Sequence, residues 1–178
     1  MVRHAFVSHR RTEEALTWVQ RGRELDPLAI SGVDIGWILF QARRYDDAFA
    51  LWLLGFALIA NNQAKEAIPV LEKALSGSDR SPGVIGVLIR AYAHAGRRTD
   101  ALRLLAELKK RRHAGYVPPA AFVNAYGGLG NDEDAFFWLE QAYQEQSNIL
   151  QWLKVHPYFD PIRGDPLFEN LLRRVGLS

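Results

Sequence analysis

The chain has 178 residues, of which 48% are hydrophobic and 24% are charged, and its formal net charge is +2. This composition is typical of a folded soluble protein and excludes an intrinsically disordered chain. The small excess of Lys and Arg argues against nucleic-acid binding, which normally needs a concentrated basic face. Because the sequence contains no cysteine, disulfides, cysteine-ligated zinc and thiol chemistry are excluded.

The N-terminal part contains only weak repeat-like segments. We expect a partial repeat over residues 1–28 and a truncated repeat over residues 29–47. The first residues lack the apolar core of a signal peptide, so we expect a cytoplasmic protein. The longest apolar run, residues 49–60, is much shorter than the roughly 20 residues of a membrane-spanning helix, and we expect no contact with a membrane.

The spacing of the repeats is broken near Ala48. A unit that begins near Ala29 should continue for 34 residues, but the next unit begins 15 residues early, so a helix is expected to be missing. Either residues 36–60 form one fused helix, or residues 45–47 make a turn. A fused helix would leave an apolar face uncovered and could make a homodimer, whereas neighbouring helices could also close the gap. The side chains concerned are Trp37, Phe40, Trp52 and Phe56.

From residue 48 onward, similar residues recur with a period of 34. A fixed period of this length is typical of a solenoid, in which each unit buries its apolar face against the next. We therefore predict full repeats over residues 48–81, 82–115 and 116–149. Small residues are expected where the two helices of a unit cross closely, with large residues beside them. The small residues are Ala67, Ala101 and Ala135, and the large ones are Leu71, Leu105 and Leu139.

Within residues 82–115 the pattern predicts two helices. Pro82 suits the first turn of a helix, and apolar residues then recur at helical spacing up to Tyr92. Gly96 suits the left-handed residue that ends a helix. Apolar residues from Ala101 to Leu108 indicate the second helix.

Residues 150–178 do not continue the repeat and are predicted to form a C-terminal cap. Asp160 and Asp165 each precede a proline, a pattern typical of helix starts. The second of these starts opens a short amphipathic helix that contains Phe168 and Leu171. Such a cap would cover the last apolar face of a solenoid.

The candidate chemical groups all have a structural explanation. His156 and Asp160 are separated by Pro157 and are expected in a cap turn rather than in acid–base catalysis. The acidic run 132–134 and the basic run 109–113 fall at a helix start and a helix end, where their charges complement the helix dipole. We therefore expect no enzyme activity, no cofactor and no metal.

The repeat resembles the tetratricopeptide repeat family. The residues that carry the resemblance are the alanines named above, the aromatic residues Tyr92 and Tyr126, and the glycines Gly96 and Gly130. The resemblance implies an all-α, right-handed α-solenoid of antiparallel helix hairpins with a C-terminal capping helix. The closing segment is similar to that of a bacterial group whose repeats often follow winged-helix or protein kinase domains, which implies a regulatory interaction module.

The resemblance also implies a concave groove, lined by the first helix of each unit, that binds a peptide or helix of a protein partner. The Lys, Asn and Arg set by which some family members bind a C-terminal carboxylate is absent. Core packing is the alternative explanation for the aromatic candidates. Replacing Arg90 and Asn124 together is expected to weaken partner binding with little loss of stability. The groove candidates are Trp37, Trp52, Phe56, Arg90, His94 and Asn124, and other groove positions hold Gly86, Gly127 and Gly128.

Overall fold

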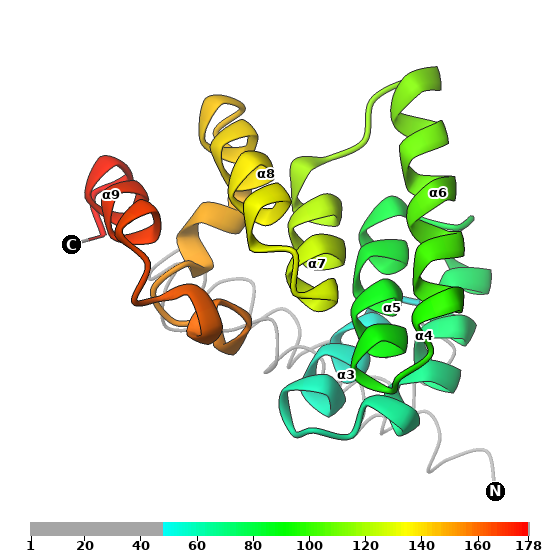
Figure 1. The fold of residues 1–178 in the computed structure, drawn as a ribbon. Coiled ribbons are helices and arrows are strands. Elements are labelled where there is room, and N and C mark those ends of the chain that lie inside the picture. The colour runs from blue at the N-terminus through cyan, green and yellow to red at the C-terminus, as the bar shows by residue number, and fades with distance from the viewer. Residues whose placement is uncertain (1–47, 178) are drawn as a thin grey trace, which may run out of the picture.

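The computed structural model describes residues 48–177 (Figure 1). The predicted units 1–28 and 29–47, the part of the proposed fused helix 36–60 that precedes Ala48 and the groove candidate Trp37 lie outside this range. Within residues 48–177 the regular elements are α-helices and 3-10 helices, without strands, which confirms the predicted all-α class. Neighbouring helices pack against each other as in a tetratricopeptide-like α-solenoid. In this range no helix is long and apolar enough to cross a bilayer.

Three helix pairs follow one another along the chain. The first helix of each pair also contacts the first helix of the next pair, so that α3, α5 and α7 are successive neighbours (Figure 1). We call these three the first-helix layer. The pairs fall within the predicted units 48–81, 82–115 and 116–149. They are α3 (Ala48–Ala60) with α4 (Ala64–Gly77), α5 (Pro82–His94) with α6 (Arg98–Ala114), and α7 (Pro119–Leu129) with α8 (Asp132–Gln144).

Local sequence signals explain several helix ends. Pro82 occupies the first turn of α5, as predicted, where its missing N–H leaves no hydrogen bond unmade. Gly96 lies just beyond α5 with φ of +77°, a left-handed conformation that glycine adopts without steric cost. The α8 helix is capped by Asn131, whose side-chain oxygen accepts a hydrogen bond from the backbone N–H of Asp134 at 3.2 Å.

The repeated small and large residues form the core between the helices. The predicted alanines at 67, 101 and 135 and the leucines at 71, 105 and 139 are all buried, which confirms their packing role. Gly55 illustrates how closely α3 and α4 approach, because a Cβ atom at this position would collide with the side chain of Leu71. The repeated residues therefore fix the size of the side chain at each helix crossing as well as its hydrophobicity.

The α5–α7 contact brings two backbones unusually close together. A Cβ atom at Gly86 in α5 would collide with the backbone carbonyl of Ala121 in α7. A Cβ atom at Gly128 in α7 would lie 2.5 Å from the Cα atom of Arg90 in α5. Because backbone atoms cannot yield as a flexible side chain can, both glycines are required for this crossing.

The C-terminal cap is built from η1 (Asn148–Trp152), η2 (Pro157–Ile162) and α9 (Pro166–Val175). The predicted start at Asp165 is confirmed, since its carboxylate accepts a hydrogen bond from the N–H of Leu167 at 2.8 Å. The predicted start at Asp160 is wrong, because η2 begins at Pro157 and holds Pro161 in its interior. Here a proline in the first turn determines the start. Phe168 and Leu171 are buried against α8 and the two 3-10 helices in a second core.

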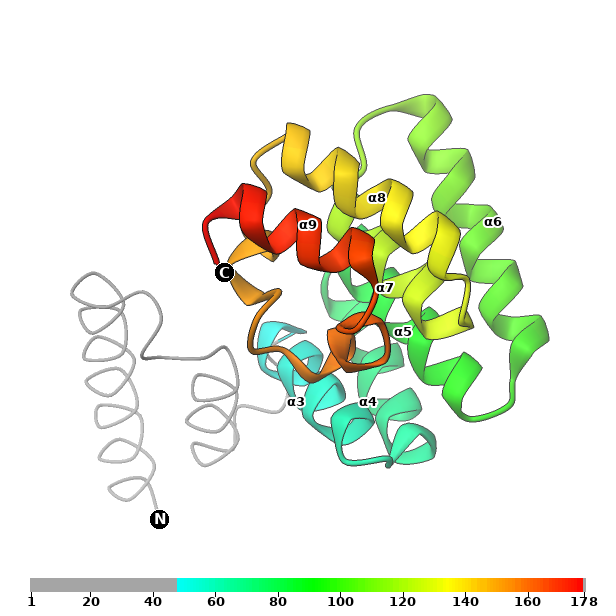
Figure 2. The same ribbon diagram turned by 60° about the vertical axis from the view of Figure 1, so that its left-hand side comes forward.

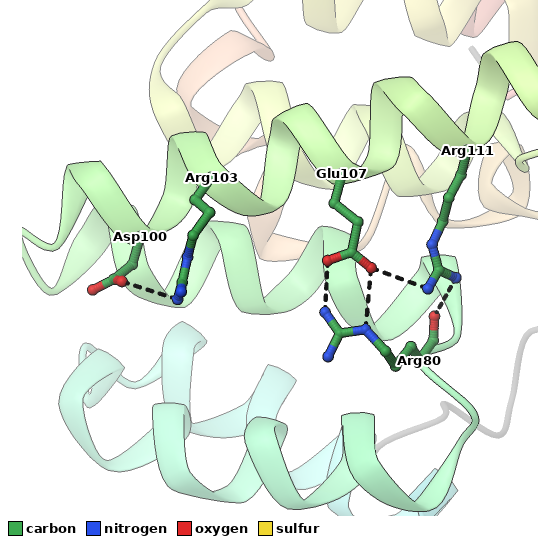
Figure 3. A network of polar contacts seen from close by, with 5 residues as sticks. All are labelled: Arg80, Asp100, Arg103, Glu107 and Arg111. Atoms are coloured by element: carbon green, nitrogen blue, oxygen red, sulfur yellow. Dashed lines mark hydrogen bonds and ion pairs between the residues drawn. The ribbon is translucent and has the colours of Figure 1, made fainter.

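A surface network ties the loop after α4 to α6 (Figure 3). Arg80 makes two hydrogen bonds to the Glu107 carboxylate, at 3.1 and 2.6 Å, and Arg111 donates to the carbonyl oxygen of Arg80 at 2.8 Å. Asp100 and Arg103 form a separate pair at 3.2 Å. These side chains are partly exposed, so each pair contributes about 1 kcal/mol or less. Tight helix crossings, rather than surface ion pairs, therefore dominate the stability.

Two glycines in α5 provide a matched test of this conclusion. We predict that Gly86→Ala destabilises the protein by about 1–3 kcal/mol, because the added methyl group meets the α7 backbone. Gly83→Ala should stabilise it by up to about 1 kcal/mol, because its Cβ would meet nothing closer than the Ser81 Oγ atom at 3.8 Å, an ordinary van der Waals distance, and alanine favours the helix. Urea unfolding followed by circular dichroism measures both free energies. Equal effects of the two substitutions would contradict the close crossing.

Candidate functional site

The aromatic candidates on α3 lie side by side. Trp52 and Phe56 are one helical turn apart, with ring centroids at 4.7 Å and an interplanar angle of 82°. Both side chains are half-buried and pack against the first core. The indole N–H of Trp52 is buried and has no hydrogen-bond partner. Trp52 and Phe56 therefore both pack against the core, and Trp52 also has an N–H group without a hydrogen-bond partner.

Arg90 on α5 is a buried cation that lacks an anionic partner. It is only 4% exposed, its Nε atom has no hydrogen-bond partner, and no carboxylate among the described residues pairs with it. Burial lowers the pKa of Arg90 to about 10. Gly127 provides room for the guanidinium, since a Cβ atom there would lie 2.7 Å from Nη2 of Arg90.

The chain's own C-terminal segment covers the candidates Phe56 and Arg90. Tyr158 in η2 stacks on Phe56 with ring centroids 5.0 Å apart and an interplanar angle of 27°. Its hydroxyl group donates a hydrogen bond to the carbonyl oxygen of Phe56 at 3.2 Å. The guanidinium carbon of Arg90 lies 4.2 Å from the centroid of the Tyr158 ring. Figure 2 shows η2 returning to the first-helix layer, although it lies about 100 residues later in the sequence.

The cation–π contact compensates only part of the cost of burying Arg90. Such contacts stabilise a protein by about 0.5–2 kcal/mol. Removing an unpaired charge from water costs several kcal/mol even after the protein relaxes. Because the desolvation cost exceeds the cation–π stabilisation, the approach of an anion to Arg90 is favoured.

His156 stabilises the turn at the start of η2 that places Tyr158 on α3. Its Nδ1 atom accepts a hydrogen bond from the N–H of Tyr158 at 3.3 Å, and its ring lies 4.4 Å from the Tyr158 ring. Burial, and then the positive charge of Arg90, lower the pKa of His156 to about 4. Asp160 opposes this effect and Arg163 adds to it. His156 is therefore neutral at pH 7, as its role as a hydrogen-bond acceptor requires.

The remaining candidates are not brought into this cluster. His94 is exposed at the C-terminal end of α5. Asn124 on α7 is 8% exposed, and its amide group donates to the carbonyl oxygen of Ala120 in the same helix at 2.9 Å. Arg90 and Asn124 are both buried, and the expectation that replacing both would leave the stability nearly unchanged stays a prediction.

Sequence reasoning assigned His156 to a cap turn and did not connect Tyr158 with α3. The cap role of His156 is confirmed by its hydrogen bond to Tyr158. The contact of Tyr158 with Phe56 depends on how the segment folds back, for which the sequence has no periodic signal. The one available hint was the neighbouring pair Tyr158 and Phe159, two aromatic residues that cannot both face one core in a tight turn.

The other charged groups that could take part in binding or catalysis have roles within the fold. In the basic run, Arg111 pairs with Glu107, and Lys109 lies 5.6 Å from the ring centroid of Tyr126. The acidic residues Asp132 to Asp134 form the first turn of α8, as predicted. Between residues 48 and 177 no group of three His, Asp or Glu side chains could hold a metal ion.

A comparison with known protein families finds a match to part of the chain. Residues 58–115 match the family model of the tetratricopeptide repeat. The helical repeats of this chain fit the tetratricopeptide repeat family. Such repeats generally mediate protein–protein interaction, and tetratricopeptide repeat proteins are typically non-enzymatic scaffolds. No curated protein and no solved structure matched the chain.

The pKa of His156 predicts how stability depends on pH. The unfolded chain binds a proton near pH 6.5 but the folded chain only near pH 4, so stability should fall as the pH drops from 6.5 to 4. His156→Asn keeps a hydrogen-bond acceptor without titrating. We expect the wild type to lose roughly 1–2 kcal/mol more than this variant over that range, allowing for partial solvent contact. Parallel stability curves from urea unfolding would contradict a buried neutral His156.

Proposed function

We propose that the chain is a non-enzymatic interaction module that binds a peptide or helix of a partner protein against the first-helix layer. The observation that supports the proposal best is the cluster of Trp52, Phe56 and Arg90 on α3 and α5. It combines aromatic surface with an indole N–H that has no hydrogen-bond partner and a buried cation that has no anionic partner among the described residues. Aromatic and Arg side chains dominate the energetics of many protein interfaces.

The proposal gives no role to nucleic acid, because the basic run at the end of α6 is partly used in contacts within the chain. It also includes a regulatory role and a cytoplasmic location. The composition favours that location, since a chain without cysteine does not depend on an oxidising environment.

A matched pair of variants tests the proposal. A partner identified by affinity capture and then purified should bind Arg90→Met at least about tenfold more weakly, because a buried interfacial charge contributes strongly to binding. Arg103→Met on the outer surface of α6 is the control and should leave the dissociation constant unchanged, since the Arg103 side chain is 73% exposed. Calorimetric titration measures both constants. Full binding by Arg90→Met, or loss of binding by the control, would contradict the assignment.

A homodimer through the apolar surface near residue 48 is the second candidate. Phe49 at the start of α3 is 47% exposed even though its ring contacts Trp52 at 5.7 Å. Exposed aromatic surface of this kind favours self-association. We expect a dimer, if it forms, to dissociate in Phe49→Ser, measured by sedimentation equilibrium over a range of concentrations. A monomeric mass at every concentration of the wild type would exclude this candidate.

A further inference from the structure

The C-terminal segment faces two cores at once. Phe159 and Ile162 are buried in the second core, which α8, α9 and the 3-10 helices share with Val123 of α7. Tyr158 instead packs against the first core, which is built mainly from α3 to α7 and also contains Ala135 of α8. Two adjacent aromatic residues therefore serve different purposes. Phe159 anchors the segment, and Tyr158 extends from that anchor onto the first-helix layer.

Tyr158 occupies the position that a partner's side chain would take under the proposed function. Its ring lies between Phe56 of α3 and Arg90 of α5, and both were predicted from the sequence to line the binding groove. Its hydroxyl group bonds to a backbone carbonyl of α3, as a bound peptide's side chain would. The contact shows directly that the first-helix layer accepts an aromatic ring at this point.

The internal contact leaves the charge at Arg90 unsatisfied. A phenol ring attracts a cation weakly, whereas a carboxylate can accept two parallel hydrogen bonds from a guanidinium. The surroundings also favour an anion. His156 is neutral, and Arg163 lies close enough to lower its pKa further. The nearby carboxylate of Asp160 is already paired with Arg163 at 2.6 Å.

We propose that residues 156–158 occupy the partner's binding site on the first-helix layer in the free protein. The partner peptide that displaces them carries an aromatic residue with a carboxylate beside it. The inference rests on the proposed function and specifies the chemistry of its ligand. The aromatic ring replaces Tyr158 on Phe56, and the carboxylate pairs with Arg90. Because the internal segment is tethered, it competes at high effective concentration and weakens the apparent affinity for the partner.

Two synthetic peptides based on the segment itself provide the probes. Both carry residues 153–161 with a fluorescent label, one with His156→Glu and the other with His156→Gln. They are titrated into the wild type, Tyr158→Ala, and Tyr158→Ala combined with Arg90→Met. Tyr158→Phe is a conservative variant that keeps the ring and loses only the hydrogen bond to Phe56. Circular dichroism establishes that each variant is folded, and amide chemical shifts locate the bound peptide.

The expected result has three parts. Tyr158→Ala binds the Glu peptide at least about tenfold more tightly than the wild type does, because the internal competitor is gone. In Tyr158→Ala the Glu peptide binds about tenfold more tightly than the Gln peptide, and Arg90→Met removes this difference. Tyr158→Phe behaves nearly as the wild type, because the ring still covers the site.

The outcomes separate this inference from the proposed function. If the wild type and Tyr158→Ala bind both peptides equally through α3 and α5, the internal competitor is wrong while the binding layer stands. If Tyr158→Ala binds more tightly but does not distinguish Glu from Gln, the acidic requirement is wrong. If neither peptide shifts the α3 and α5 amides in any folded variant, the inference and the proposed binding layer both fail.

Discussion

The close crossing of α5 and α7 is the constraint on which the rest of the structure depends. With Gly86 against the Ala121 carbonyl and Gly128 against Arg90, the two helices approach nearer than any larger residue allows. This proximity places the Arg90 guanidinium between the helices, where burial removes most of its water. The close packing of α5 against α7 therefore buries the positive charge of Arg90. This charge makes the first-helix layer suited to binding an anion.

The C-terminal cap has two roles that follow from one short segment. Through Phe159, Ile162 and Phe168 it closes the apolar end of the solenoid, as the last unit of a repeat protein requires. Through Tyr158 it also reaches α3, so the C-terminal cap contacts the first described helix. A solenoid whose units touch only their neighbours would unfold in steps. This additional contact makes its ends depend on each other.

The sequence predicted the parts of the fold that repeat. Ala67, Ala101 and Ala135 recur at fixed spacing because each lies at the same crossing in its unit, so their burial could be anticipated. The start of η2 was misjudged because two prolines, Pro157 and Pro161, each offered a helix start, and the second lies within the helix.

The candidate site was predictable only in part. Family resemblance pointed to Phe56 and Arg90, and their positions on α3 and α5 place them around one ring. Tyr158 could not be anticipated, because its contact joins segments about 100 residues apart and has no period in the sequence. Asn124, by contrast, bonds within its own helix, since a buried amide must find a partner wherever one is nearest.

The central claim is that the aromatic ring of Tyr158 lies on the first-helix layer in the free protein. The most direct measurement is a nuclear Overhauser spectrum of the isotopically labelled chain, read for cross-peaks between the ring protons of Tyr158 and Phe56. With ring centroids 5.0 Å apart, strong cross-peaks are predicted, together with ring-current shifts of the Arg90 side-chain protons. An absence of cross-peaks, with Tyr158 resonating as in an unfolded peptide, would contradict the account.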